Sequence, residues 1–414
     1  MRSQLAGVAL IATIAGARPA VTQDIVVAPG TPVPTLGAAL ARARPGAHIV
    51  VEGGHYAEPV VTITVPRVRI EGRNWPEFSG SGAHTVLVIA ADSVTVRGLT
   101  VTNSGFSGIE DRAGILVRNA RDCVVEGNRV RETAFGIYLS RSVGCVVRGN
   151  VVEASRRSEY SSGNAIHLWY SPYTRLAQNR VNGHRDGLYF EFSPHSAAEG
   201  NEVLNVTRYG LHFMYSDTCR YEDNVFDRNG SGVAVMFSHH VVIQRNRFAA
   251  AIGPAAYGLL LKEIYDGDIA MNVFRDNSTG MHLEGALRLN VRGNTFAGNG
   301  FAIRVLGSAE MNRFTGNAFA GNAFDVVTNT RAATSTFDRN WWDGYRGYDL
   351  DRDGVGDVPF RPVRLFALVV AQHPPALLLL RSPLVAILDA AERVVPVLTP
   401  NTLVDVHPLM RPPR

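Results

Sequence analysis

The sequence predicts an all-β fold, a right-handed parallel β-helix solenoid of about ten coils, from three repeated features. An asparagine recurs every 22 to 29 residues, an apolar residue follows two positions later, and a Gly or Ala then opens an alternating apolar run. The asparagines are Asn128, Asn150, Asn179, Asn201, Asn224, Asn246, Asn272, Asn294, Asn317 and Asn340. Alternation is a strand signal, and Gly, Asn and Ser between the runs are turn signals. Because a unit of about 22 residues cannot bury a core alone, the units must stack, and equivalent residues then form straight columns.

The asparagine column is expected to be structural. Asn tolerates left-handed bends between strands, and its amide can hydrogen-bond up and down a stack. Two longer units carry extra loop near residues 155–163 and 252–257. Insertions of this kind in solenoids protrude from one face and often bind partners.

The first 23 residues predict a secretory signal peptide, with Arg2 ahead of an apolar run from Leu5 to Ala17. This run is shorter than the ~20 residues that a membrane-spanning helix needs. We therefore expect export to a bacterial periplasm. The net charge of +4 on 414 residues, without a basic run, predicts no nucleic-acid partner.

The solenoid is expected to occupy residues 24–340, with a cap at its N-terminal end. Thr35–Gly46 predicts a short helix whose Leu36, Ala39 and Leu40 share one face. Such a helix would cover the first coil, which otherwise exposes the core.

The three cysteines fall in one column, because Cys123, Cys145 and Cys219 each precede a repeated Asn by five residues. Alternation places this column inside, where thiols act as small hydrophobic side chains. Cys123 and Cys145 lie on adjacent coils, so a strained disulfide between them is the alternative.

Residues 341–365 contain a calcium-type loop. Carboxylates stand at positions 1, 3, 5 and 9, and Gly354 at position 6 permits a sharp turn. The expected ligands are Asp349, Asp351, Asp353, the carbonyl of Val355, and Asp357. Phe360 replaces the Glu of a full EF-hand, and no helix follows. A structural Ca²⁺ is therefore predicted, with a solvated acidic turn as the alternative.

Residues 366–414 are expected to form a tail that contains an amphipathic helix. Ser382 and Pro383 give a helix start, and apolar residues then recur at helical spacing. These residues are Leu384, Ile387, Leu388, Ala391, Val394, Val395 and Leu398. This helix can fold back on the solenoid or dock on a partner or a membrane surface, and the sequence does not choose between them.

Two outward columns carry the residues with the most chemistry, because the third and fifth positions of each alternating run point away from the core. Register brings one group onto a patch of roughly four coils beside Trp169. The group is His167, Glu191, His212, Met214 and Met236. Imidazole and thioether ligands suit copper as Cu(I). The alternative is an amphipathic surface that binds another protein.

A polysaccharide-active enzyme is the other function class, since β-helices often cleave or epimerise polysaccharides. Such chemistry needs paired carboxylates, or a carboxylate with a cation, in one groove. The available groups, Asp186, Glu191, Lys262 and Glu284, are spread over several coils. We therefore expect no enzyme, and we keep a polysaccharide-active (lyase, hydrolase or epimerase) or carbohydrate-binding β-helix as the alternative.

Three segments together resemble one family. They are the Asn-punctuated coils, the stretch Asn340–Pro362 (NWWDGYRGYDLDRDGVGDVPFRP), and the tail Arg381–Pro400 followed by LVDVHPLMRPP. With them, the chain resembles the NosD family of periplasmic maturation proteins of nitrous oxide reductase along nearly its whole length.

The resemblance implies a non-enzymatic subunit that carries or hands over copper for the centres of that reductase. It implies four partners: the ABC permease NosY, its ATPase NosF, the copper chaperone NosL and the client reductase NosZ. It further implies association with the inner-membrane transporter, through the permease or the C-terminal tail. It supplies no copper ligands, so the His/Met patch depends on the residues of this chain alone.

Overall fold

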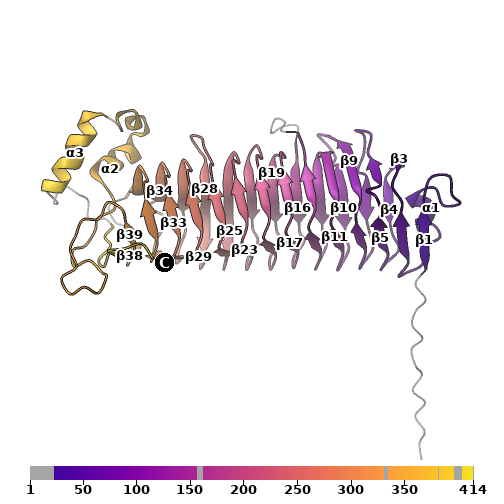
Figure 1. Ribbon diagram of the computed structural model, residues 1–414, viewed down its shortest axis with the longest axis horizontal. Coiled ribbons are helices and arrows are strands. Elements are labelled where there is room, and N and C mark those ends of the chain that lie inside the picture. The colour runs from indigo at the N-terminus through magenta and orange to yellow at the C-terminus, as the bar shows by residue number, and fades with distance from the viewer. Residues whose placement is uncertain (1–22, 156–161, 331–333, 381, 396–402, 414) are drawn as a thin grey trace, which may run out of the picture.

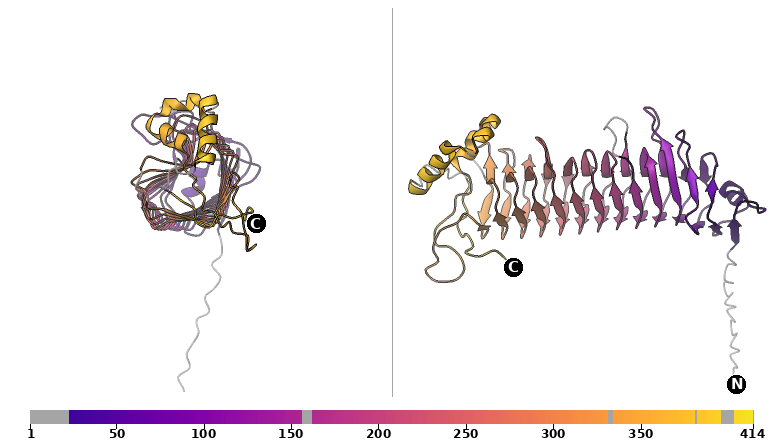
Figure 2. Two further views of the ribbon diagram at one scale, coloured as in Figure 1. Left: turned by 90° about the vertical axis from the view of Figure 1, so that its left-hand side faces the viewer. Right: turned by 45° about the horizontal axis from the view of Figure 1, so that its top comes forward.

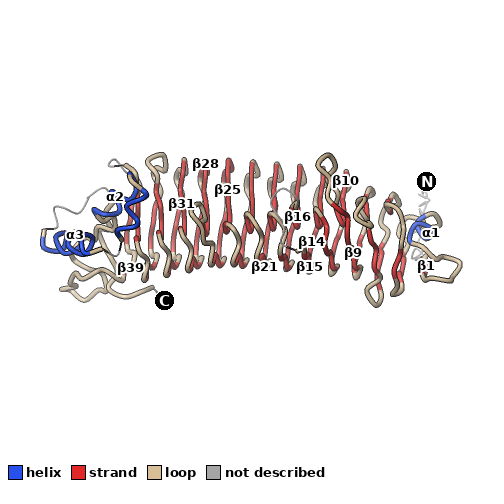
Figure 3. Tube along the Cα trace, turned by 90° about the horizontal axis from the view of Figure 1, so that it is seen from above, coloured by secondary structure: helices blue, strands red, loops and turns tan. Residues whose placement is uncertain are grey.

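The chain forms a long stack of coils with short helices at both ends, as the computed structural model shows (Figure 1). The structure describes residues 23–155, 162–330, 334–380, 382–395 and 403–413. Three parallel sheets run along the stack, with 14, 12 and 13 strands, and each coil gives one strand to each sheet (Figure 3). The predicted parallel β-helix is confirmed. It has about 13 coils rather than the expected ten.

The strands fall into three sheets, numbered here 1 to 3. Sheet 1 comprises β1 (Asp24–Val27), β2 (His48–Val51), β5 (Arg69–Gly72), β8 (Thr95–Arg97), β11 (Val124–Glu126), β14 (Val146–Arg148), β17 (Arg175–Ala177), β20 (Ala197–Glu199), β23 (Arg220–Glu222), β26 (Val242–Gln244), β29 (Asp268–Ala270), β32 (Asn290–Arg292), β35 (Arg313–Thr315) and β38 (Thr336–Asp338). Sheet 2 comprises β4 (Val61–Ile63), β7 (Leu87–Ile89), β10 (Ala113–Arg118), β13 (Phe135–Ser140), β16 (Asn164–Trp169), β19 (Asp186–Glu191), β22 (Tyr209–Met214), β25 (Ser231–His239), β28 (Tyr257–Tyr265), β31 (Thr279–Glu284), β34 (Phe301–Val305) and β37 (Phe324–Thr328). Sheet 3 comprises β3 (His55–Tyr56), β6 (Glu77–Ser79), β9 (Thr100–Gly105), β12 (Arg129–Thr133), β15 (Val151–Glu153), β18 (Arg180–Asn182), β21 (Glu202–Leu204), β24 (Val225–Asp227), β27 (Arg247–Ala249), β30 (Val273–Arg275), β33 (Thr295–Ala297), β36 (Ala318–Ala320) and β39 (Trp341–Trp342).

The asparagine column is a buried hydrogen-bond ladder. The backbone N–H and the Nδ2 of Asn201 both donate to Oδ1 of Asn224, each at 2.9 Å, and Asn224 donates in the same way to Asn246. Each Nδ2 also donates to a backbone carbonyl, as Asn224 does to Ala198 at 2.9 Å. The ladder therefore satisfies polar backbone groups at the buried turns, which would otherwise cost free energy.

The ladder ends on a carboxylate from the C-terminal segment. The backbone N–H and Nδ2 of Asn340 and the indole Nε1 of Trp342 all donate to Oδ2 of Asp405, each at 3.0 Å. Asp405 is fully buried there. The segment around Asp405 thus continues the solenoid beyond the last asparagine.

The additional coils lie where the asparagine pattern is absent. In the two coils that precede Asn128, the strand register aligns the ladder position with Leu99 and Pro76. The oxygen Oδ1 of Asn128 still accepts the backbone N–H of Leu99, at 3.1 Å. The stacking therefore continues without an Asn to mark it in the sequence.

A short helix, α1 (Leu36–Leu40), covers the N-terminal end of the core. The side chain of Thr35 accepts from the N–H of Ala38 at 3.1 Å, and the carboxylate of Glu58 accepts the N–H groups of Leu36 and Gly37. The helix is shorter than the expected Thr35–Gly46. Residues 41–46 form turns instead, because Pro45 lacks an N–H and disfavours helical conformation in the residue before it.

Helical segments cover the last strand of sheet 2 at the other end (Figure 2). They are α2 (Leu365–Gln372), a 3₁₀ helix (Pro374–Leu379) and α3 (Pro383–Val394). Phe366 and Val370 of α2 pack on Phe324 and Val327 of β37. The expected apolar face of α3 is only partly used, since Leu384, Ile387 and Val394 are exposed.

The cysteine column lies in the core, and Cys123, Cys145 and Cys219 are buried free thiols. The structure therefore contains the thiol form rather than the Cys123–Cys145 disulfide that the sequence left as an alternative.

We predict that Asn224→Ala lowers the free energy of unfolding by about 3 kcal/mol, because it leaves buried donors of Asn201 and buried acceptors on Ala198 and Asn246 unpaired. Denaturant unfolding of the full chain measures this. The control is Asn182→Ala, which removes one partly buried bond from Asn205 and should cost under about 1 kcal/mol. Equal effects of the two substitutions would contradict a structural role for the ladder.

Candidate functional site

The outer face of sheet 2 carries two parallel columns of side chains, and strand pairing fixes which residues are neighbours. In the first column, Tyr138 pairs with His167, His167 with Tyr189, and Tyr189 with His212. In the second, Trp169 pairs with Glu191, Glu191 with Met214, and Met214 with Met236. The structure thus places His167, Glu191, His212, Met214 and Met236 on four successive strands, β16, β19, β22 and β25.

A serine ladder holds the end of each of these strands. Ser171, Ser193, Ser216 and Ser238 each donate Oγ–H to the carbonyl of the second-column residue two positions before, at 2.9 to 3.1 Å. The backbone N–H of each of the first three donates to Oγ of the next serine. Because these bonds connect successive coils, they fix the spacing of the second column.

The histidines point outward yet are nearly buried, because rings stack along the first column. The ring centroids of Tyr138 and His167 are 4.7 Å apart, those of His167 and Tyr189 are 4.7 Å apart, and those of Tyr189 and His212 are 4.6 Å apart. His167 and His212 are only 7 % and 6 % exposed. Burial lowers the pKa of His167 below its usual value.

A buried carboxylate lies beside His212. Oδ2 of Asp186 is 3.8 Å from Nδ1 of His212 and 3.4 Å from Nε of Arg185, and Oδ1 accepts the N–H of Tyr209 at 3.1 Å. Burial alone would raise the pKa of Asp186, but His212, Arg185 and the Tyr209 N–H together hold it below its usual value.

His167 has a different environment. Its Nδ1 lies 3.4 Å from Nδ2 of Asn164, and its Nε2 lies 3.8 Å from Oε2 of Glu191. Asn164 in turn accepts a bond from Nη2 of Arg185 through Oδ1, at 2.9 Å.

The two methionines complete the patch as partly buried neighbours on β22 and β25. The hydroxyl of Tyr189 donates to Sδ of Met214 at 3.7 Å. His282 lies in the first column but three strands away from His212, beyond Ala234 and Leu260. His282 is therefore not part of this group.

Sequence reasoning missed an aromatic row at the corner that follows sheet 2. Tyr170, Phe192, Tyr215 and Phe237 stack at 4.7 to 5.1 Å, and all have φ between 47° and 54°. Bulky residues rarely adopt this left-handed conformation. The signal was available, because each residue directly follows a second-column residue. The row surrounds the patch with partly exposed aromatic surface.

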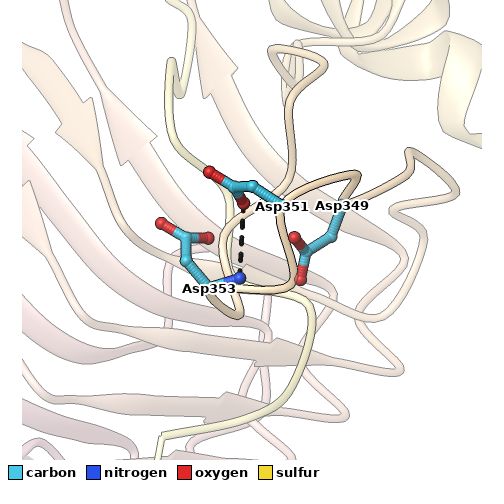
Figure 4. Close-up of side chains that lie close together, drawn as sticks. All are labelled: Asp349, Asp351 and Asp353. Carbon is cyan, nitrogen blue, oxygen red and sulfur yellow. Dashed lines mark hydrogen bonds between the residues drawn. The ribbon is translucent and has the colours of Figure 1, made fainter.

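The acidic loop brings three of its carboxylates together. One oxygen each of Asp349, Asp351 and Asp353 lies within 4.8 Å of the others (Figure 4). Asp357 lies outside this group, because its Oδ2 accepts the N–H of Leu350 at 2.7 Å. The N–H of Val355 donates to Oδ1 of Asp353 at 2.7 Å.

The acidic loop is tied to the C-terminal segment by backbone bonds. Gly356 donates its N–H to the carbonyl of Pro408 at 2.8 Å, and Met410 donates to the carbonyl of Gly354 at 3.0 Å. Gly354 has φ of +88°, which permits the turn. The loop therefore joins the end of the solenoid to the segment that carries Asp405.

The candidate groups for polysaccharide chemistry do not form a carboxylate pair. Asp186 contacts His212 and Glu191 approaches His167, while Lys262 and Glu284 form an ion pair at 2.9 Å. A glycosidase-type site needs two carboxyl groups that flank one bond.

Comparison with known proteins places these features in a family. The chain is 33 % identical over 408 residues to the "Probable ABC transporter binding protein NosD" of Pseudomonas aeruginosa, covering 91 % of this chain and 94 % of that protein. The chain belongs to the NosD family. A relative with the same description from Stutzerimonas stutzeri is 28 % identical, covering 81 % of this chain and 81 % of that protein.

Family models agree with this assignment. Residues 153–347 match the family described as "Periplasmic copper-binding protein (NosD)", and residues 67–164 match "Right handed beta helix region". The match to the NosD family model includes the whole His/Met patch.

Solved structures share the fold alone. An α-1,3-glucanase of Streptomyces thermodiastaticus has a TM-score of 0.61 at 14 % identity, covering 81 % of this chain and 71 % of that chain. A mannuronan C-5 epimerase module of Azotobacter vinelandii has a TM-score of 0.51 at 15 % identity, covering 70 % of this chain and 89 % of that chain. Within the described residues, no helix has the length and hydrophobicity needed to cross a membrane.

The environment of His282 generates a pH prediction. Burial, together with Arg304, lowers the pKa of His282 to about 4, from a usual value near 6.5. The unfolded chain then takes up a proton at this residue as the pH falls below about 6.5, while the folded chain does not. Folded-state stability is therefore lost between about pH 6.5 and pH 4.

We predict that His282→Leu loses about 2 kcal/mol less unfolding free energy than the wild type between pH 7 and pH 5. Denaturant unfolding at both pH values measures the difference, so any effect of the substitution that is independent of pH cancels. The same loss in both proteins would contradict this prediction.

Proposed function

We propose that this protein is a non-enzymatic periplasmic subunit that binds Cu(I) and hands it over during assembly of the copper centres of nitrous oxide reductase. The observation that carries the proposal is one imidazole, from His212, beside two thioethers, from Met214 and Met236, on adjacent strands of one outer face. Soft thioether ligands with imidazole select Cu(I).

The spacing of the coils suits such a site. Paired positions on neighbouring strands are about 4.8 Å apart, and a metal–sulfur bond is about 2.3 Å long for zinc. Two methionines in register can therefore bracket one ion, with the imidazole from the neighbouring column as a third ligand. This arrangement leaves the ion at the surface, where a partner can reach it.

The family assignment supports the cellular setting. The family is described as periplasmic and copper-binding, and both relatives are described as binding proteins of an ABC transporter. We propose the permease NosY and the ATPase NosF as the transporter, NosL as the copper donor and NosZ as the recipient. Export would use the signal peptide of residues 1–23, of which residues 1–22 lie outside the described part of the chain.

The C-terminal helices supply a surface for the transporter or the adjacent membrane. Leu378 of the 3₁₀ helix and Leu384, Ile387 and Val394 of α3 are all more than half exposed. Apolar side chains gathered in this way mark contact surfaces. The helices lie at the opposite end of the molecule from α1 (Figure 1).

We predict that the purified chain binds Cu(I) stoichiometrically in an anaerobic titration against a competing chelator. Replacing Met214 and Met236 by Leu, or His212 by Ala, should weaken this binding at least tenfold, because each substitution removes a soft ligand while largely keeping the fold. Met271→Leu is the matched control, since Met271 is exposed at a different corner of the solenoid.

Two results would count against the proposal. Absence of Cu(I) binding by the wild type would exclude a copper site, and polysaccharide cleavage abolished by Glu191→Gln would favour the enzyme alternative. Loss of binding in the Met271→Leu control would show that the His/Met patch is not the site.

We also propose that Asp349, Asp351 and Asp353 hold a structural Ca²⁺, with Asp357 outside the ligand group. The support is the convergence of three carboxylates, since hard oxygen ligands suit this ion. A cation there would offset their repulsion and fasten the loop that bonds to Pro408 and Met410.

Calcium at saturating concentration is expected to raise the thermal unfolding temperature by a few degrees, because a ligand that binds only the folded state stabilises it. The double substitution Asp351→Asn with Asp353→Asn should abolish the rise. Asp276→Asn, at an exposed aspartate on another coil, serves as the control. An equal rise in all three proteins would refute the site.

A further inference from the structure

Two histidines of the same column face carboxylates through different ring nitrogens. His212 directs Nδ1 toward Oδ2 of Asp186 at 3.8 Å, whereas His167 directs Nε2 toward Oε2 of Glu191 at 3.8 Å. Among the described residues, neither of these nitrogens has a hydrogen-bond partner. Since a neutral imidazole has one N–H and one lone pair, the two rings differ in what they offer a ligand.

The proton of His212 is assigned by Asp186. This carboxylate is fully buried, and both of its oxygens face donors, from Arg185 on one side and the Tyr209 N–H on the other. An ionised carboxylate only accepts hydrogen bonds. The ring nitrogen that faces it must therefore carry the proton, so the lone pair of His212 is on Nε2. Metal-binding histidines commonly have this arrangement, with the second nitrogen directed at a carboxylate.

The proton of His167 is assigned by a chain of three residues. The guanidinium of Arg185 has donors only, so the amide oxygen of Asn164 must face it, as the 2.9 Å bond shows. The NH₂ group of Asn164 then faces Nδ1 of His167 at 3.4 Å, and Nδ1 must accept. The proton of His167 is consequently on Nε2, which leaves no lone pair on the side of Glu191.

We propose that Asp186 and Asn164 are positioning residues that set opposite tautomers at His212 and His167. Copper is then bound by Nε2 of His212 with Met214 and Met236, and His167 serves as a hydrogen-bond donor. This inference rests on the proposed copper function, but the tautomers themselves exist without copper. It removes His167 and Glu191 from the ligand set that the sequence predicted.

The tautomers are measured directly on the full chain without metal. Long-range ¹H–¹⁵N spectra of protein labelled with ¹⁵N-histidine distinguish the two forms, and His212→Ala and His167→Ala assign the signals. We expect the Nδ1–H form at His212 and the Nε2–H form at His167. The reverse form at either residue would overturn the proposal.

Two isosteric substitutions test the cause. In Asp186→Asn the amide oxygen stays on the fixed N–H of Tyr209 and the NH₂ group turns to His212, so the His212 signal should change to the Nε2–H form. In Asn164→Asp the new carboxylate accepts from both Arg185 and His167, so the His167 signal should change to the Nδ1–H form. A signal that does not change at the expected residue would show that these groups do not set the tautomer.

The effect on copper is measured by the same chelator competition. Asp186→Asn should weaken Cu(I) binding 10- to 100-fold, the usual range for such supporting groups. Asn164→Asp and Glu191→Gln should leave it within about twofold. His282→Ala is the matched control, a buried histidine of the same column whose replacement should have no effect. Loss of binding in Glu191→Gln would return Glu191 to the ligand set and overturn the proposal.

The two proposals fail in distinguishable ways. If the wild type shows the expected tautomers but binds no Cu(I), the copper function fails and the role of Asp186 and Asn164 in setting the tautomers holds. If the wild type binds Cu(I) and Asp186→Asn binds equally well, the copper function holds and the positioning role fails.

Discussion

The rest of the structure depends on strand register between successive coils. In a parallel stack, a slip of one residue would move every inward side chain outward. Register here is fixed by side-chain ladders inside the turns, with Asn224 bonded to Asn246 and Ser193 bonded to Ser216. These bonds are buried, so any slip would leave several polar groups unpaired in the core. The chemistry of the outer face is therefore set by bonds on the inner side of the turns.

The same register explains how much the sequence could predict. A ladder Asn lies a fixed number of residues from the outward positions, so counting from Asn201 and Asn224 was sufficient to place His212 and Met214 beside Glu191 and Met236. The coils before Asn128 were missed, because Leu99 and Pro76 stand where the Asn would be. Apolar and proline residues at this position give no periodic signal.

The finer properties of the site could not be predicted, because they depend on side-chain directions rather than on spacing. His167 and His212 are equivalent in the sequence pattern. Only the contacts with Asn164 and Asp186 distinguish them. In the same way, the pattern of the acidic loop included Asp357, but a bond to the N–H of Leu350 draws this carboxylate away from the other three.

The asparagine ladder also gives the solenoid an electrical polarity. Every rung donates toward the C-terminal end, so the amide dipoles add along the axis as peptide dipoles do in a helix. The positive end of this array falls at Asn340, where the carboxylate of Asp405 accepts its bonds. Burial raises the pKa of Asp405, while the bonds from Trp342 and Asn340 act in the opposite direction. The C-terminal segment thus acts as a counter-charge for the whole column, and the molecule has a chemically distinct end next to the helices that we propose contact the transporter.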